Sequence, residues 1–190
     1  MPQTKILLDT NAYLRLAKSI HPLLGKEFGK KNFALYIHKE IEIELNRSSR
    51  LQSKFNWIGQ EEYKENRKKK LIIKKTKQAD IENTYEHIWQ YQKDKRYNLS
   101  REDIYCIATA LELGINLVTD DRNMIKVCKE FEVDILTTLE LMKLMQDNNH
   151  IDIELIKQII EYWKYENDLP TNLITFEKNI KKLFGNFENK

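Results

Sequence analysis

The sequence predicts an α/β fold built around a parallel β-sheet. Short apolar runs of strand length alternate with segments of helical periodicity, which is typical of parallel strands joined by crossover helices. Only 5 Gly and 3 Pro occur among 190 residues, too few turn formers for a sandwich or barrel of many short hairpins. Hydrophobic residues make up 41% and charged residues 32% of the chain, a balance that suits one soluble domain with a substantial core.

The first half of the chain supplies two predicted strands and the helices around them. The apolar run 5–8 predicts a buried strand, and the Asp-Thr-Asn sequence at 9–11 contains residues that favour helix starts. The other elements expected before residue 99 are a strand over 33–38, a helix through Ile41 and Leu45, a polar helix over 53–70, a short strand or buried turn at 71–73, and a helix from Asp80.

The clearest α/β pattern lies between residues 99 and 145. Ser100 and Asp103 have the spacing of a capping box, and the apolar helix that follows is expected to end at Gly114. The later elements are a strand over 115–119, a helix over 122–131, a strand over 133–136, a helix from Thr137 through Met145, and helices over 151–165 and 176–184. The change of pattern divides the chain into a domain over 1–146 and a helical extension over 147–190 that packs on it.

Acidic residues gather where the predicted strands end. Asp9 directly follows the first strand, and Asp120 and Asp121 directly follow the third. Asp103 lies in the first turn of the helix before that third strand, and Glu44 lies on the helix after the second. Ligands of open parallel sheets bind beyond the carboxyl ends of the strands. We therefore expect these carboxylates to converge, although they come from distant parts of the chain.

Converging carboxylates need a positive counterion. They repel one another, and a desolvated unpaired carboxylate is costly, yet no Lys or Arg occupies an obvious pairing position in this set. Mg²⁺ or Mn²⁺ prefers oxygen ligands of this kind. Such an ion can activate water and stabilise the oxygens of a phosphodiester, so the residues predict a metal-dependent nuclease.

Four sequence blocks resemble the PIN-domain nucleases over residues 4–145. The resemblance implies a three-layer parallel-sheet fold, cleavage of RNA with Mg²⁺ or Mn²⁺, and kinship with the VapC-like toxin ribonucleases of type II toxin–antitoxin systems. The matching blocks are Leu7-Leu8-Asp9-Thr10-Asn11, Glu44-Leu45, Asp103-Ile104 with Ala108 to Gly114, and Leu117-Val118-Thr119-Asp120-Asp121-Arg122.

The resemblance also assigns roles residue by residue. Asp9, Asp103 and Asp121 correspond to metal ligands, and Glu44 completes the catalytic set as a further acidic ligand. Supporting roles in orienting the carboxylates or a bound water fall to Asn11 and Thr119, while Asp120 stands where the family often has Asn and Asn123 where it often has an acid.

A basic segment is the second candidate site. Residues 64–77 hold eight Lys or Arg and one acid, which is typical either of a solvated helix end or of phosphate contacts beside the active site. Trp57 and Tyr63 nearby are more typical of a core than of base stacking. The predicted contacts with RNA are Arg67, Lys68, Lys69, Lys70, Lys74 and Lys75.

Several of these residues also have a purely structural interpretation. Asp9 and Asp103 also fit as helix caps, and Glu44 also fits a solvated helix face. A second hypothesis is therefore a PIN-like module that binds RNA or protein without cutting. The expected partners are RNA, an antitoxin protein and a second copy of the chain.

The cellular location is predicted from two absences in the sequence. No signal-peptide pattern begins the chain, and no apolar run approaches the length of a membrane span. Cys106 and Cys128 lack metal-type spacing and are expected to be reduced thiols. These features predict a cytoplasmic protein that does not associate with a membrane.

Overall fold

The sheet of the computed structural model, which describes residues 2–186, has four parallel strands in the order β2-β1-β3-β4. The central strand β1 pairs with β2 and β3, so that Leu8 lies opposite both Ile37 and Val118. The residues that follow these three therefore leave the sheet along one edge. The strands are β1 (Thr4–Leu8), β2 (Phe33–Ile37), β3 (Asn116–Val118) and β4 (Ile135–Leu136).

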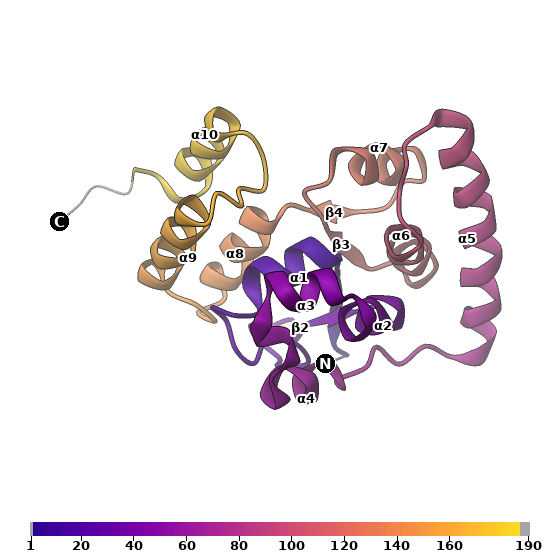
Figure 1. Ribbon diagram of the computed structural model, residues 1–190, viewed down its shortest axis with the longest axis horizontal. Helices are drawn as coiled ribbons and strands as arrows, with labels where there is room; N and C mark the ends of the chain where they lie inside the picture. Colours follow the sequence, from indigo (N-terminus) through magenta and orange to yellow (C-terminus); the bar gives the residue numbers. More distant parts are fainter. Residues whose placement is uncertain (1, 187–190) are drawn as a thin grey trace.

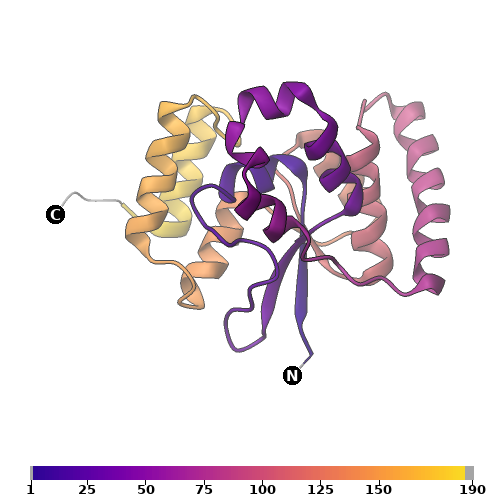
Figure 2. The ribbon, with the colours of Figure 1, turned by 60° about the horizontal axis from the view of Figure 1, so that its bottom comes forward.

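Helices cover both faces of this sheet, as expected for parallel strands. Figure 2 shows α5 and α6 on one side of the strands and α8, α9 and α10 on the other. The parallel-sheet α/β prediction, with additional C-terminal helices, is thus confirmed. The helices that flank the strands are α1 (Thr10–Leu16), α6 (Arg101–Leu113), α7 (Arg122–Glu130) and α8 (Thr138–Asp147).

The segment between β2 and α6 differs from its prediction. The single helix expected over 53–70 is wrong, because Phe55 leaves the helical region (φ −124°, ψ 72°) and Trp57 and Ile58 turn into the core. The strand alternative at 71–73 is also wrong, since those residues join α4 to α5 without a strand and Ile72 is 81% exposed. The observed elements are α2 (Lys39–Arg47), α3 (Ser49–Lys54), the 3-10 helix η1 (Asn56–Gly59), α4 (Glu61–Arg67) and α5 (Lys75–Lys95).

The C-terminal helices α9 (Ile153–Tyr165) and α10 (Leu173–Phe184) share the core of the sheet domain. Trp163 and Phe176 are fully buried, and the Trp163 indole N–H donates to the carbonyl of Arg15 on α1 at 3.2 Å. Figure 1 shows this helical layer beside α8. Among the helices of residues 2–186, none combines the length and apolar character that crossing a membrane requires.

Candidate active site

Asp9 lies at the carboxyl end of the central strand. Its side chain caps α1, where Asp9 Oδ1 accepts a hydrogen bond from the Ala12 N–H at 2.6 Å. Burial is the main cause that raises the pKa of Asp9 to about 7, and the charges of Asp120 and Asp103 raise it further. Hydrogen bonds from Thr119 and Ala12 act in the opposite direction. A buried carboxylate of this kind favours a nearby cation at neutral pH.

Asp103 is the residue that connects the other acids electrostatically. It lies in the first turn of α6, in the predicted capping box, where Asp103 Oδ2 accepts from the Ser100 N–H at 2.9 Å. Burial raises the pKa of Asp103, bonds from Ser100 lower it, and the charges of Asp121 and Glu102 raise it. Its own charge raises the pKa of Asp9 and of Glu44.

Glu44 turns toward this acidic group from α2. Its Oε2 accepts a hydrogen bond from the hydroxyl of Thr10, the residue directly after Asp9, at 3.0 Å. Burial of the carboxylate raises the pKa of Glu44, the Thr10 bond lowers it, and the charges of Glu102 and Asp103 raise it. The Glu44 residue is thus half-buried, and its part in the site stays a prediction.

Asp121 follows β3 and caps α7. Its Oδ1 accepts from the N–H groups of Asn123 and Met124, both at 2.8 Å, and its own N–H donates to Thr119 Oγ at 3.1 Å. The Thr119 hydroxyl thus lies beside both Asp9 and Asp121, and the supporting role given to it stays a prediction. Asn11, by contrast, is exposed at the start of α1.

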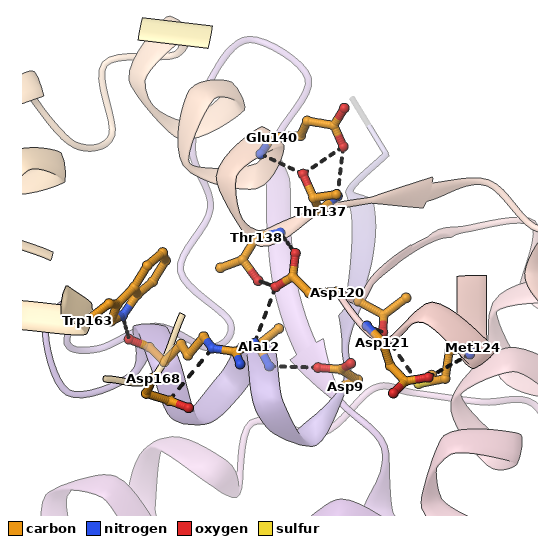
Figure 3. A network of polar contacts seen from close by, with 12 residues as sticks. Asp9, Ala12, Asp120, Asp121, Met124, Thr137, Thr138, Glu140, Trp163 and Asp168 are labelled. Atoms are coloured by element: carbon orange, nitrogen blue, oxygen red, sulfur yellow. Dashed lines mark hydrogen bonds and ion pairs between the residues drawn. The ribbon is translucent and has the colours of Figure 1, made fainter. Parts of the chain in front are cut away.

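Asp120 points away from Asp121, as Figure 3 shows. Its carboxylate lies 3.4 Å from the Arg15 guanidinium and accepts bonds from the Thr138 N–H and hydroxyl. Arg15 also lies 3.7 Å from Asp168, in the loop after α9. Asp120 therefore connects α1 and α8, while its charge also raises the pKa of Asp9, and the supporting role predicted for it stays a prediction. Sequence reasoning missed Arg15, although an Arg within the apolar 13–17 stretch was the available signal.

The side chains present suit a hard divalent cation by their chemistry. Asp9, Glu44, Asp103 and Asp121 offer carboxylate oxygens, and an ion needs only one oxygen from each, so capping and metal binding are compatible. Across residues 2–186, no three His, Cys, Asp or Glu side chains stand close enough to hold one ion as they lie. Binding would therefore require these side chains to move toward one another.

The basic segment 64–77 does not form one continuous face. Arg67 is buried, and its guanidinium donates to the Ile58 carbonyl at 2.8 Å, to Asn46 and to the Tyr13 hydroxyl. Phosphate contact by Arg67 is thus a prediction that the structure does not support. Trp57 and Tyr63 are buried, in agreement with the core interpretation. Lys68, Lys69, Lys70, Lys74 and Lys75 are exposed.

An open parallel sheet with acidic side chains along its carboxyl edge defines an open-sheet α/β protein, a class in which ligands bind at that edge. A family model described as PIN domain matches residues 6–130. The chain belongs to the PIN domain family. Members of this family are generally nucleases, are often toxins of toxin–antitoxin systems, and typically use divalent metal ions.

Comparison with solved structures finds FitAcB from Neisseria gonorrhoeae. It is 15% identical in sequence to this chain, and the superposition has a TM-score of 0.42. The match covers 70% of this chain and 97% of that chain. No curated protein matches this chain in sequence.

Proposed function

We propose that this chain is a Mg²⁺- or Mn²⁺-dependent ribonuclease that hydrolyses phosphodiester bonds. One observation carries the proposal. Asp9, Glu44 and Asp103 come from three separate elements, and the charge of Asp103 raises the pKa of the other two. Within residues 2–186, no Lys or Arg forms an ion pair with any of the three. A bound divalent cation is the counterion that suits such a group.

The proposed roles follow from the position of each side chain. Asp9, Asp103 and Asp121 hold the ion, which in this class of site activates water and offsets charge on the phosphate. The Thr119 hydroxyl bonds to the Asp9 carboxylate and accepts the backbone N–H of Asp121, which positions both residues. Glu44, whose pKa is raised, is the carboxylate suited to accept the proton of the attacking water.

Cleavage of labelled RNA tests the proposal. Wild-type protein with Mn²⁺ is expected to cut the RNA, and excess EDTA is expected to stop it. Asp9→Asn and Asp121→Asn should each abolish cleavage, because Asn keeps the helix cap but removes the charge. Asp120→Asn is the matched control and should keep cutting. Full activity in Asp9→Asn, or undiminished activity in EDTA, would contradict the proposal. Labelled single-stranded DNA, tested in parallel, shows whether the protein cuts RNA, DNA or both.

A PIN-like module that binds RNA or protein without cutting is the second candidate. Asn123 favours it, because its amide donates to the Tyr97 carbonyl at 2.9 Å and supplies no carboxylate. A Mn²⁺ titration without binding, together with retained RNA binding, would support this candidate over the first.

The family suggests that this ribonuclease acts in the cell as the toxin of a toxin–antitoxin system. It predicts that expression of the chain arrests growth and that a small antitoxin, encoded beside it, relieves the arrest. Toxicity that persists in Asp9→Asn would separate the growth effect from cleavage.

A second copy of the chain remains a further expected partner, to be tested by the mass of the purified protein in solution.

A further inference from the structure

A second surface lies directly beside Asp121, where the end of α5, the loop after it and the start of α7 meet (Figure 1). Asn123 joins the two regions. Its N–H donates to Asp121 Oδ1 at 2.8 Å, and its side-chain amide donates to the Tyr97 carbonyl at 2.9 Å. An extended ligand bound along this surface therefore reaches the acidic site while it stays in contact with the protein.

Two lysine–aromatic pairs, whose rings Tyr91 and Tyr97 contact each other, define this surface, which we call the aromatic–basic surface. Each lysine is exposed and each ring is partly exposed. The Tyr97 pair is formed between two elements, because Lys126 belongs to α7 and Tyr97 to the loop after α5. The ammonium-to-centroid distances are 5.8 Å for Lys95 and Tyr91 and 5.5 Å for Lys126 and Tyr97.

The charge of this surface is unbalanced. Arg96 and Arg122 are also exposed, so that segments 95–96 and 122–126 together carry four cations and no acid, while Glu130 at the end of α7 lies beside Tyr91. Within the described chain, none of the four cations forms an ion pair with a carboxylate. Excess positive charge of this kind attracts polyanions.

We infer that the aromatic–basic surface binds a single-stranded polynucleotide and leads it to the acidic site. This inference rests on the proposed nuclease function. Lysines on flexible stems pair with phosphates, and ring faces stack on bases that a single strand leaves unpaired. A duplex hides those base faces. The surface also differs from segment 64–77, where Arg67 is buried and Lys68 already pairs with Glu65.

Binding can be measured separately from cleavage. The full chain carrying Asp9→Asn, in EDTA, is titrated with a single-stranded RNA oligonucleotide. Stacking is tested at Tyr97, whose ring lies 5.5 Å from the Lys126 ammonium. In an anisotropy assay, Tyr97→Leu should bind about fivefold more weakly than the parent, while Tyr97→Phe, which keeps a ring, should bind as the parent does. Equal binding of Tyr97→Leu and the parent would overturn the stacking at this ring.

Removal of positive charges tests whether the polynucleotide binds along the aromatic–basic surface. The triple variant Lys95→Ala, Arg96→Ala and Lys126→Ala should bind RNA at least about tenfold more weakly, and its logarithmic salt dependence should fall by about 2 for three lost phosphate contacts. The matched control replaces three exposed lysines of the loop before β2, at the opposite end of the sheet, and should bind as the parent does. That control is Lys26→Ala, Lys30→Ala and Lys31→Ala.

The outcomes separate this inference from the proposed function. Equal affinity of the triple variant and its parent, or equal binding of duplex and single strand, would overturn the path even if the wild type cuts RNA. Weakened binding in the triple variant supports the path even if the wild type cuts nothing, in which case only the nuclease proposal fails. RNA and DNA strands of one sequence, compared in the same titration, identify which polynucleotide the surface prefers.

Discussion

The guanidinium of Arg15 lies 3.4 Å from the carboxylate of Asp120, and both side chains are nearly buried. This ion pair explains why two adjacent aspartates act differently. Asp120 turns toward Arg15 and Thr138, while Asp121 caps α7 beside the other acids. Asp168, in the loop after α9, lies 3.7 Å from the same Arg15, so the pair also connects the C-terminal helices to the edge of the sheet.

Loss of Arg15 is therefore expected to reduce stability strongly. Arg15→Met keeps an apolar stem but leaves Asp120 buried without its cation, which typically costs about 3 kcal/mol or more. Urea unfolding of the two proteins measures this difference in free energy. The double variant Arg15→Met and Asp120→Asn should recover part of the loss, because no unpaired charge remains. A double variant less stable than Arg15→Met alone would contradict this account of the pair.

Asp9→Asn is expected to behave in the opposite way without metal. Burial raises the pKa of Asp9 to about 7, so the ionised form is unfavourable in the folded chain at pH 8. Asn preserves the cap on Ala12 and removes that charge, and thermal unfolding in EDTA should show a melting temperature equal to or above the wild type's. Mn²⁺ at a hundred times its Kd should stabilise the wild type by about 3 kcal/mol and the variant much less.

The matched control for that measurement is Asp120→Asn. It alters the neighbouring carboxylate that pairs with Arg15, so its response to Mn²⁺ should equal the wild type's. A lost response in Asp120→Asn, or a full response in Asp9→Asn, would show that the cation binds elsewhere.

The sheet could be predicted because local signals and topology agree, whereas the acidic site stays a prediction. Apolar runs gave the strands, and residues that follow neighbouring parallel strands leave the sheet along one edge, as Asp9 and Thr119 do. Asp103 was marked by its capping box. These inferences need only the order of the helices and strands, which the sequence pattern indicates.

The misplaced residues depended instead on tertiary contacts. Arg67 belongs to a basic run, yet the carbonyl of Ile58 and the hydroxyl of Tyr13 bind its guanidinium inside the fold. The partner of Asp120 is Arg15, 105 residues away in sequence. The segment 53–70 breaks into three elements because its aromatic side chains enter the core. The hydrophobic periodicity of a single segment does not predict contacts between residues that lie far apart in the sequence.

Acid is expected to destabilise the protein through His38. This imidazole is buried, stacks on Tyr105 and accepts the Glu40 N–H at the start of α2. Burial lowers its pKa from 6.5 to about 4, with smaller contributions from Lys39 and Arg101. The unfolded chain therefore binds a proton before the folded chain does. The stability contributed by neutral His38 is complete above pH 6.5 and is lost as the pH falls toward 4.

The His38→Asn variant isolates that effect. Asn retains a cap acceptor but does not titrate, so its free energy of unfolding should fall less than the wild type's between pH 6.5 and 4. The site carboxylates with raised pKa act in the opposite direction, so the comparison uses the difference between the two proteins at each pH. The exposed His87→Asn serves as control. Parallel pH profiles for wild type and His38→Asn would contradict the assignment.

The C-terminal helices are expected to unfold together with the sheet domain. Trp163 on α9 is 1% exposed and its indole donates to the Arg15 carbonyl, whereas Tyr165, two residues later, is 86% exposed. Trp163→Ala should therefore cost about 3 to 5 kcal/mol, and Tyr165→Ala should change stability by less than about 0.5 kcal/mol. Urea unfolding followed by circular dichroism measures both.

The shape of the transition decides whether residues 147–190 are a separate unit. Trp163 donates to the backbone carbonyl of Arg15 on α1, so that α9 is bound directly to the helix that follows the central strand. Trp163→Ala should then shift one cooperative transition, while Tyr165→Ala leaves that transition unchanged. Two separate transitions would mean that the extension folds independently of the sheet domain.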